Sequence, residues 1–381
     1  MTKALMQQAA QMCKREHEEE IEELGLLPPS HNIDPLNPPL TIAEYEAMEK
    51  DLSKYLLYMA ALSAAVGSLP KSLGLSSPLK FLVVGPGLGR LITFCLDAAT
   101  SHGRSGVVHV LEANPRAVGF LEERFAAEVA AGQVVLHEAF ILRNTTEPQD
   151  LPKSLAGHVH SFNIIAITIP DRWKTYLAPI YCPSIYAHIA SKGDSNDTQN
   201  QRHSSMAHVT AIPADAVLLG PSRLLYSASC VEPPTSVYAG EIRWKVDVES
   251  TTGPARDRSS DVVVHGFVGH FTCHLFGGIK LDTRHGSAAR NTFHWESMFF
   301  PLSTPVDLGS NRRGGSCRTT IGVRLERRSA VKQSALASGP ADLHAIWYEW
   351  RLLSDDDDDR PAIAGNSLPH NPDGRFQSLY L

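Results

Sequence analysis

Three glycines, Gly85, Gly87 and Gly89, directly follow the apolar run KFLVV and precede a stretch of helical composition. A turn of this kind lets backbone amides and a helix N-terminus approach a ligand closely, because no Cβ stands in the way. Glycine-rich turns also close strand–helix units that bind no ligand. The turn by itself therefore leaves both interpretations open.

Two acids at the ends of the next apolar runs favour a nucleoside ligand. The G-x-G-x-G spacing is tighter than the G-x-G-x-x-G of dinucleotide sites and is the usual form in methyltransferases that hold S-adenosyl-L-methionine. Glu112 ends the run VVHVLE, where a doubly wound fold places an acid that binds the two ribose hydroxyls. Glu138, near the end of QVVLHEA, could accept a hydrogen bond from an adenine amino group. Both acids could instead only cap the loops that they begin.

These residues need a parallel sheet to bring them together, and the chain predicts one. From Lys80 to Ile169, four apolar runs alternate with stretches of helical composition, ending in FNIIAITI. Strands separated by ten or more helical residues imply right-handed crossovers and a doubly wound α/β domain. Upstream, Thr41 and Glu44 form a capping-box pattern that predicts a helix running to about Ala65.

The alternation fails after Ile169. Residues 191–206 are polar and predict a surface loop, and beyond Pro213 short strands separated by turns predict a β-sandwich or barrel-like domain. The acidic run Asp355–Asp359 predicts a solvated loop. The predicted division is residues 1–39, an N-terminal helix and proline-rich linker; residues 40–212, a Rossmann-like methyltransferase domain; and residues 213–381, a β-rich domain for substrate binding and oligomerisation.

Composition excludes several classes of protein. The 381 residues are 43% hydrophobic and 20% charged, which argues against global disorder. The net charge of −6 argues against the basic field of nucleic-acid binders. No apolar run of about eighteen residues predicts a membrane span. The six cysteines form no C-x-x-C pair and the start of the sequence has no apolar signal core, so we expect a cytoplasmic or nuclear protein.

A metal site is not predicted. His265, His270, Cys273 and His274 lie within ten residues, but on a strand His270 and His274 would face one way and the other two the opposite way. We therefore expect histidines of the core or the sheet edge rather than a zinc site. No G-x-S-x-G elbow for a serine nucleophile is present.

Several blocks, from about Leu40 to the C-terminus, resemble the symmetric-type protein arginine methyltransferases. The segment YEAMEKDLSKY is similar to the helix with which that family covers its cofactor, and LEANPRAV resembles the end of its second strand. The blocks HGFVGHF, FFPL preceded by Trp295, WYEW and HNPDGR follow in the family order. The family's large N-terminal barrel, which recruits a WD-repeat partner, has no matching residues in this sequence.

The resemblance implies methyl transfer from S-adenosyl-L-methionine to arginine side chains of proteins. It also implies protein substrates rich in arginine and glycine, and a homo- or hetero-oligomer. Carried over by position, Trp295 would line the substrate entrance. The residues implied for the cofactor are Tyr45, Lys54 and Tyr55 as its cover, Gly85 and Gly87 as the turn, Glu112 at the ribose, and Glu138 and Ala139 at the adenine.

The departures from the family concern the catalytic residues, and no catalytic residue is assigned. Family members carry two glutamates on a hairpin loop after the fourth strand. Here Thr168 falls at the first position and Leu177 near the second, and Asp171 is the only acid between Thr168 and Ala190. At the position where the family has an arginine in the glycine turn, this sequence has Leu88, although Arg90 is close by. At the position of the family's phenylalanine that is linked to symmetric products, this sequence has Met48.

The missing carboxylates matter because a guanidinium is always protonated and has only donors to offer. Two carboxylates neutralise it, grip it in a bidentate way and orient one nitrogen toward the methyl group. We therefore predict that activity is weakened or lost. The alternatives are a non-catalytic regulatory or scaffold subunit that partners an active enzyme, or a small-molecule methyltransferase. An error of sequence joining in residues 168–206 is a further alternative.

Overall fold

The computed structural model describes residues 31–32, 41–70, 77–112, 114–138, 167–191, 204–213, 215–230, 237–247, 262–285, 295–308, 318–333, 342–353, 368–375 and 379–380. Several predicted features lie outside these residues. They are most of the N-terminal helix and linker, Ala139, most of the fourth strand, most of the polar stretch 191–206, and the acidic run 355–359.

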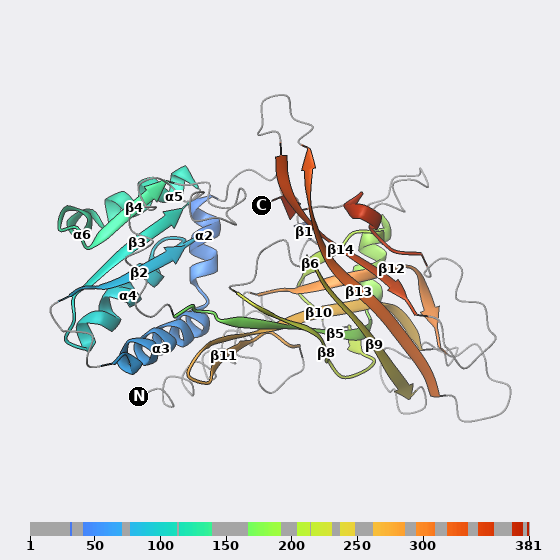
Figure 1. Cartoon of the computed structure of the whole chain (residues 1–381). Coiled ribbons are helices and arrows are strands. Elements are labelled where there is room, and N and C mark those ends of the chain that lie inside the picture. The colour runs from blue at the N-terminus through green and yellow to red at the C-terminus, as the bar shows by residue number, and fades with distance from the viewer. Residues whose placement is uncertain are drawn as a thin grey trace.

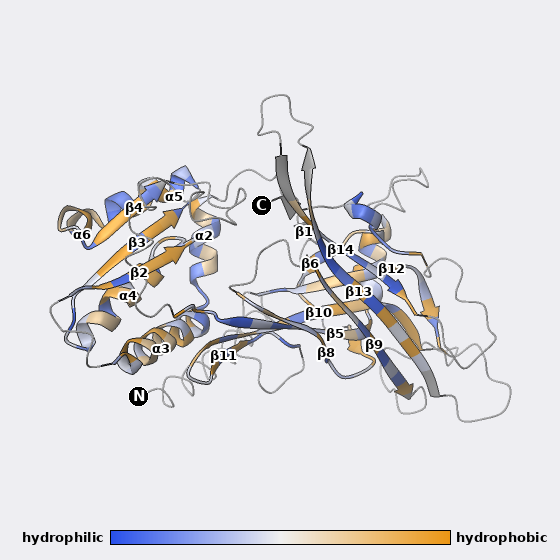
Figure 2. Ribbon diagram, in the orientation of Figure 1, coloured by the Kyte–Doolittle hydropathy of each residue, from blue (hydrophilic) through white to orange (hydrophobic). Residues whose placement is uncertain are grey.

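A parallel sheet forms the N-terminal half, as the alternating pattern predicts (Figure 1). Among the described residues its strands are in the order β2-β3-β4. Ile92 and Cys95 on one helix and Leu121 on another are buried against Val108 and Val110 of the central strand. Figure 2 shows β2 and β3 largely in hydrophobic colours, as expected for strands of a parallel sheet. The elements are β2 (Leu79–Val84), α4 (Arg90–Ser101), β3 (Gly106–Glu112), α5 (Pro115–Arg124), α6 (Ala126–Ala130) and β4 (Val134–Glu138).

Two helices precede this sheet where one was predicted. The capping box at the start of α2 (Ile42–Glu49) is confirmed: the Thr41 hydroxyl accepts from the Glu44 amide at 3.3 Å, and the Glu44 carboxylate accepts from the Thr41 amide. The predicted continuation to Ala65 is wrong, because a second helix, α3 (Leu52–Ser68), starts anew. The Asp51 carboxylate accepts from the Lys54 amide at 2.9 Å and so caps α3 instead of continuing α2.

The C-terminal half is built of strands, as predicted. Within the described residues they form an eight-stranded and a four-stranded sheet. Trp244 of the smaller sheet packs on Phe267 of the larger one, and Trp350 of the smaller sheet packs on Phe300. The larger sheet contains β1 (His31–Asn32), β5 (Arg172–Tyr181), β6 (His208–Thr210), β7 (Val217–Leu218), β8 (Arg223–Ser229), β10 (Val263–Phe276), β11 (Ile279–Asp282) and β12 (Ser297–Asp307). The smaller sheet contains β9 (Tyr238–Asp247), β13 (Arg318–Gln333), β14 (Asp342–Leu352) and β15 (Leu379–Tyr380).

Strand β5 and the helix after it, α8 (Pro183–Ser191), were not predicted. The strand carries a proline and five charged or hydroxyl side chains, so its alternation is weak. Its place is set by long-range pairing: β5 runs antiparallel to β10, with Tyr176 opposite His270 and Ala178 opposite Val268. Residues 172–181 therefore belong with the β-rich half, although the sequence assigned them to the 40–212 domain.

Four cysteines of the described residues are free thiols: Cys95, Cys182, Cys230 and Cys273. Burial raises the pKa of Cys95 to about 12, and also raises that of Cys273 to about 12, so both remain protonated near neutral pH. In the described part of the chain, no helix has both the length and the apolar character needed to cross a membrane.

The HNPDGR segment folds back on β14 around a buried histidine. The His370 Nε2 accepts from the Ser303 amide at 3.1 Å, its Nδ1 lies 3.0 Å from the Trp350 carbonyl oxygen, and its ring stacks on the Trp350 indole. The short helix η3 (Pro372–Gly374) follows. Because Nε2 is an acceptor in this arrangement, the imidazole is neutral. Burial lowers the pKa of His370 below its ordinary value of 6.5, and the bond to Trp350 offsets this only in part.

We predict that stability falls on acidification as this imidazole takes up a proton. A lowered pKa in the folded state means that the unfolded chain binds the proton first as the pH falls. The contribution of His370 is thus complete above about pH 6.5 and is lost as the pH falls toward the lowered value. Urea unfolding at about pH 7.5 and about pH 5.5 measures the difference. The variant His370→Gln should be less stable at the higher pH and should lose less on acidification; an equal loss in both proteins would contradict the assignment.

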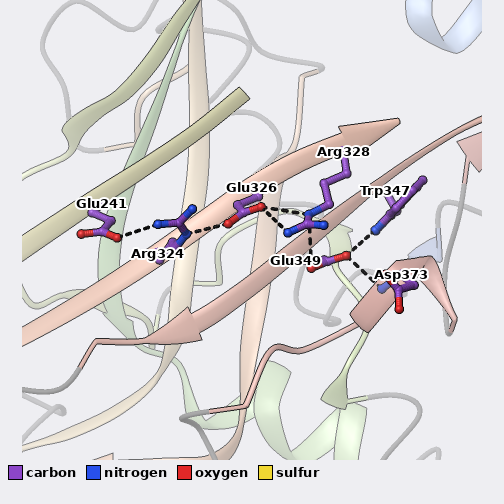
Figure 3. A network of polar contacts seen from close by, with 7 residues as sticks. All are labelled: Glu241, Arg324, Glu326, Arg328, Trp347, Glu349 and Asp373. Carbon is purple, nitrogen blue, oxygen red and sulfur yellow. Dashed lines mark hydrogen bonds and ion pairs between the residues drawn. The ribbon is translucent and has the colours of Figure 1, made fainter. Parts of the chain in front are cut away.

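The outer face of β13 and β14 carries a charged network (Figure 3). Glu326 and Glu349 lie directly opposite each other in register, which would be repulsive on its own. Arg328 is paired with both carboxylates, at 2.7 Å and 3.4 Å, as Figure 3 shows. Buried Glu349 also accepts from the Trp347 indole at 2.7 Å and from the Asp373 amide at 2.9 Å, so it joins the folded-back segment to the sheet.

We predict that Glu349→Ala destabilises the protein by about 3 kcal/mol, since it removes the acceptor of the buried Trp347 indole and of the Asp373 amide and one of the two carboxylates that pair with Arg328. The matched control is Glu241→Ala, which removes an exposed partner of Arg324 in the same network and should change stability by less than about 1 kcal/mol. Thermal unfolding of the two variants compares them. Equal losses would show that Glu349 has no special role.

Candidate cofactor and substrate site

The glycine turn has a backbone that other residues adopt with strain. Gly85, Gly87 and Gly89 have φ of +63°, +61° and +99°. The Gly85 amide donates to the Leu111 carbonyl at 2.9 Å, which ties the turn to the end of β3. A Cβ at Gly89 would lie 2.4 Å from a ring carbon of Phe125, so this position also has no room for a side chain. Leu88, at the position of the family's arginine, is buried, which explains its apolar side chain.

Tyr45 lies against this turn. Its ring carbon Cδ1 is 3.6 Å from where a Cβ of Gly87 would stand. The Asn114 side-chain amide donates to the Tyr45 hydroxyl at 3.4 Å, and the Asn114 backbone amide donates to the Glu112 carboxylate at 2.9 Å. Burial raises the pKa of Tyr45, and the nearby Glu112 charge adds to the effect. The structure thus brings Tyr45, Gly87 and Glu112 together through Asn114.

A second group joins the end of α2, α3, α4 and the segment just before β12. The Lys54 ammonium lies 4.7 Å from the centre of the Tyr55 ring and 5.5 Å from that of Trp295. The Arg90 guanidinium lies 5.1 Å from the centre of the same Tyr55 ring, and its Nε donates to Glu49 at 3.2 Å. Three predicted residues, Lys54, Tyr55 and Trp295, are therefore neighbours.

Burial controls the titration of this second group. It lowers the pKa of Lys54, and the charges of Asp51 and Glu49 offset this only in part. It also raises the pKa of Tyr55 to about 12, with the Glu49 charge acting in the same direction. Tyr55 therefore remains a neutral phenol near neutral pH, beside the Lys54 amine, the Arg90 guanidinium and the Glu49 side chain.

For Glu138 the structure describes the position of the backbone but not that of the side chain. The parallel register puts it opposite Glu112 at the ends of β4 and β3, the edge at which the glycine turn follows β2. The side chain of Glu138 and the whole of Ala139 lie outside the described residues, so their predicted contacts with an adenine stay predictions.

The loop expected to carry two glutamates has one acid, and that acid is paired. The Asp171 carboxylate accepts from the His274 ring at 2.8 Å and from Arg172 at 3.4 Å. Partial burial acts to raise the pKa of Asp171, but these two partners outweigh it and lower the pKa. Thr168 is exposed, and Leu177 is fully buried in the core between the sheets. Neither position offers a charge to a guanidinium.

The histidines of β10 make separate contacts. His265 accepts from the Cys182 amide at 3.2 Å, His270 lies 3.2 Å from the Ser297 hydroxyl, and His274 bonds Asp171. No group of three His, Cys, Asp or Glu side chains in the described ranges is placed to hold a metal ion.

The residues at the turn fit S-adenosyl-L-methionine. The glycines keep Cβ atoms out of the space beneath Tyr45, and a buried acid, Glu112, ends β3 where a ribose acceptor is required. The Tyr45 ring would suit the adenosyl group, and the two cations of the second group would suit the carboxylate at the amino-acid end of the cofactor.

Comparison with known families agrees with this geometry. Residues 17–148 match the family model described as PRMT5 arginine-N-methyltransferase, and residues 172–379 match the PRMT5 oligomerisation domain. The second match alone covers more than half of the chain. The chain belongs to the PRMT5 family. The oligomerisation-domain match begins at Arg172, the first residue of β5, in agreement with the strand pairing.

Relatives of this PRMT5-family chain carry the name protein arginine N-methyltransferase 5. The chain is 25% identical to the protein of Oryza sativa subsp. indica over 340 residues, which are 84% of this chain and 47% of the relative. It is 24% identical to the Xenopus laevis protein over 372 residues, which are 92% of this chain and 52% of the relative. The chain thus spans about half the length of these relatives.

A solved structure supports the fold. The chain is similar to a structure described as the Trypanosoma brucei PRMT1 enzyme-prozyme heterotetrameric complex with AdoHcy, with a TM-score of 0.56 and 13% identity. The match covers 90% of this chain and 98% of the other. A Rossmann-like methyltransferase domain followed by a β-rich domain is therefore the architecture of this PRMT5-family chain.

Sequence reasoning missed two residues of the site. Asn114 lies within the LEANPRAV block but was not singled out, and its side chain joins Tyr45 to the end of β3. Glu49 directly follows Met48 in the YEAMEKDLSKY block, and its pairing with Arg90 spans 41 positions. The block could have drawn attention to Glu49, but only the fold shows its partner. Met48 itself is 44% exposed.

We predict that Gly89→Ala destabilises the protein by about 3 kcal/mol or more, because the new methyl group meets Phe125 and the backbone has φ of +99°. The matched control is Gly132→Ala, at φ of +69° with no atom within 4 Å, which should cost only about 1 kcal/mol. Thermal unfolding of the two variants separates steric contact from backbone strain. Equal costs would show that the Phe125 contact relaxes freely.

Proposed function

We propose that this chain binds S-adenosyl-L-methionine in the cradle of Tyr45, Gly87 and Glu112 and transfers its methyl group to protein arginine only slowly. The observation that carries the second part is the pairing of Asp171, the only acid of the expected loop, with His274 and Arg172. Membership of the PRMT5 family supports the reaction class.

Each residue of the proposed site would have a separate role, set by its charge and shape. Glu112 would bind the ribose hydroxyls, the turn at Gly85 and Gly87 would admit the cofactor closely, and Tyr45 would cover it. When bound, the cofactor supplies an electrophilic methyl group on a sulfonium. Lys54 would meet its carboxylate, and Trp295, beside Lys54, would line the entry of the arginine.

We expect the chain to bind the guanidinium of the substrate arginine poorly. A protonated guanidinium drawn beside a sulfonium brings two cations together where water is excluded. Removing the partners of a buried charge costs about 3 to 5 kcal/mol. That corresponds to a rate loss of roughly a hundred- to several-thousand-fold. Asp171 cannot compensate while it is bound to two cationic or donor groups.

A second candidate function is that of a regulatory or scaffold subunit in an oligomer with an active enzyme. The match to an oligomerisation domain favours an assembly, and the similar solved structure is named as an enzyme with its prozyme. A slow enzyme and a regulatory subunit differ in one respect: the regulatory subunit raises the turnover of a partner chain without turnover of its own.

We predict turnover on a glycine- and arginine-rich peptide that is about a hundredfold or more below that of an active PRMT5-family enzyme. Transfer of label from S-adenosyl-L-methionine measures it, and calorimetry on the same protein measures cofactor binding. Turnover equal to that of the active enzyme would overturn the claim of weakened chemistry. Absence of cofactor binding would overturn the cofactor assignment and leave the scaffold role.

A charge restored to the loop should raise the residual rate. We predict that Thr168→Glu increases turnover by about tenfold, since a carboxylate at this position can neutralise part of the guanidinium charge. The matched control is Thr168→Gln, which has the same shape without the charge and should leave the rate unchanged. An equal response of the two variants would show that position 168 does not face the arginine.

A further inference from the structure

Glu49 presents a buried carboxylate oxygen that no other described residue uses. This last residue of α2 is 9% exposed, and its Oε2 accepts from Arg90 Nε at 3.2 Å. Its Oε1 is buried and has no hydrogen-bond partner in the described part of the chain. Buried polar atoms are almost always hydrogen-bonded, and an orphaned charged oxygen is costly. The exception calls for a donor that arrives with a ligand.

The surroundings of Glu49 define the charge of that ligand. Arg90 pairs with Glu49 and lies over the Tyr55 ring, and Lys54 lies over the same ring. The Lys54 ammonium also donates to the carbonyl of Met48, the residue before Glu49, at 3.2 Å, so it lies beside the end of α2. One carboxylate with an open acceptor therefore stands beside two cations on a common aromatic ring.

An α-amino acid end matches this arrangement better than a guanidinium does. Its ammonium group offers donors and its carboxylate offers acceptors, both attached to one carbon, so it suits a neighbouring anion and cation at once. A substrate guanidinium is wholly cationic and would be repelled by Arg90 and Lys54. The free oxygen of Glu49 therefore suits the amino-acid end of the cofactor.

We propose that Glu49 Oε1 accepts a hydrogen bond from the α-ammonium group of S-adenosyl-L-methionine, while Arg90 and Lys54 attract the α-carboxylate on the same carbon. This assignment rests on the proposed function, because it requires the nucleoside to lie in the cradle of Tyr45, Gly87 and Glu112. It gives Glu49 a binding role beyond its pairing with Arg90.

The test titrates three nucleosides into the full chain and Glu49→Gln by calorimetry. S-adenosyl-L-homocysteine carries both charged groups, its deamino analogue lacks the ammonium, and 5′-methylthioadenosine lacks the whole amino-acid end. We expect Glu49→Gln to weaken S-adenosyl-L-homocysteine about tenfold, as a lost charge-assisted hydrogen bond does. We expect the affinities of the other two nucleosides to stay within about twofold. An equal loss for all three would show that Glu49 acts only on the structure of the site, and no loss for any would overturn the proposal.

Two further variants serve as a control and as an independent test. Glu46→Gln, at an exposed position of the same helix, should bind all three nucleosides as the unchanged protein does. Arg90→Met should weaken both nucleosides that carry a carboxylate, the deamino analogue included, and spare 5′-methylthioadenosine. This pattern differs from that of Glu49→Gln, so it keeps the proposal testable should Glu49→Gln fold poorly; loss on the deamino analogue equal to that on 5′-methylthioadenosine would contradict it.

The outcomes also separate this inference from the proposed function. If the unchanged chain binds none of the three nucleosides, the proposed cofactor site fails and the inference fails with it. If the unchanged chain binds all three but Glu49→Gln gives no preference among them, the cofactor site stands and only the role of Glu49 is overturned.

Discussion

Helix α3 is packed on two sides, and the candidate site depends on that packing. On one side Leu57, Ala60 and Ala61 are buried against Leu275 and its neighbours on β10 and β11. On another side α3 runs along α4 (Figure 1). Small alanine side chains let the strands approach closely, and burying a leucine such as Leu57 contributes about 2 kcal/mol. The first turn of α3 is held firmly as a result.

The first turn of α3 carries Lys54 and Tyr55, so one packed helix sets the position of both. Arg90 reaches the Tyr55 ring from α4, and Trp295 reaches Lys54 from the strand side. The break at Asp51 matters here, because it lets α2 turn and bring Glu49 to Arg90. A continuous helix would have placed Glu49 and Lys54 by helical geometry alone. The site is therefore a product of contact between the two halves and not of the Rossmann-like half by itself.

Two carboxylates near the site are in opposite situations. Asp171 is partly exposed and already holds a histidine and an arginine. Glu49 is buried and holds one arginine through one oxygen. What a carboxylate can do for a ligand depends on the partners that the fold has already given it. The acid on the expected loop has its contacts satisfied, whereas the acid on the helix does not.

Local structure could be predicted well from the sequence, whereas contacts between distant segments could not. The Thr41–Glu44 capping box and the glycine turn depend on neighbouring residues, the parallel sheet follows from the regular alternation of apolar and helical stretches, and the structure has all three. The helix break was missed because Asp51 is compatible with either a helix or a cap until packing decides. Strand β5 was missed because its partners are β8 and β10, far along the chain. The candidate site residues were found through resemblance and motif, but the Glu49–Arg90 pair required the fold.

Phe125 lies between the glycine turn and the junction of α5 and α6. It follows the last residue of α5 and directly precedes α6, and its ring fills the space that Gly89 leaves open. Movement at this junction between two helices would be transmitted to the backbone of the turn through direct contact with an aromatic ring. The outer helices of the sheet are therefore in direct contact with the glycine turn, and a substitution at their junction can alter the backbone of that turn from a distance.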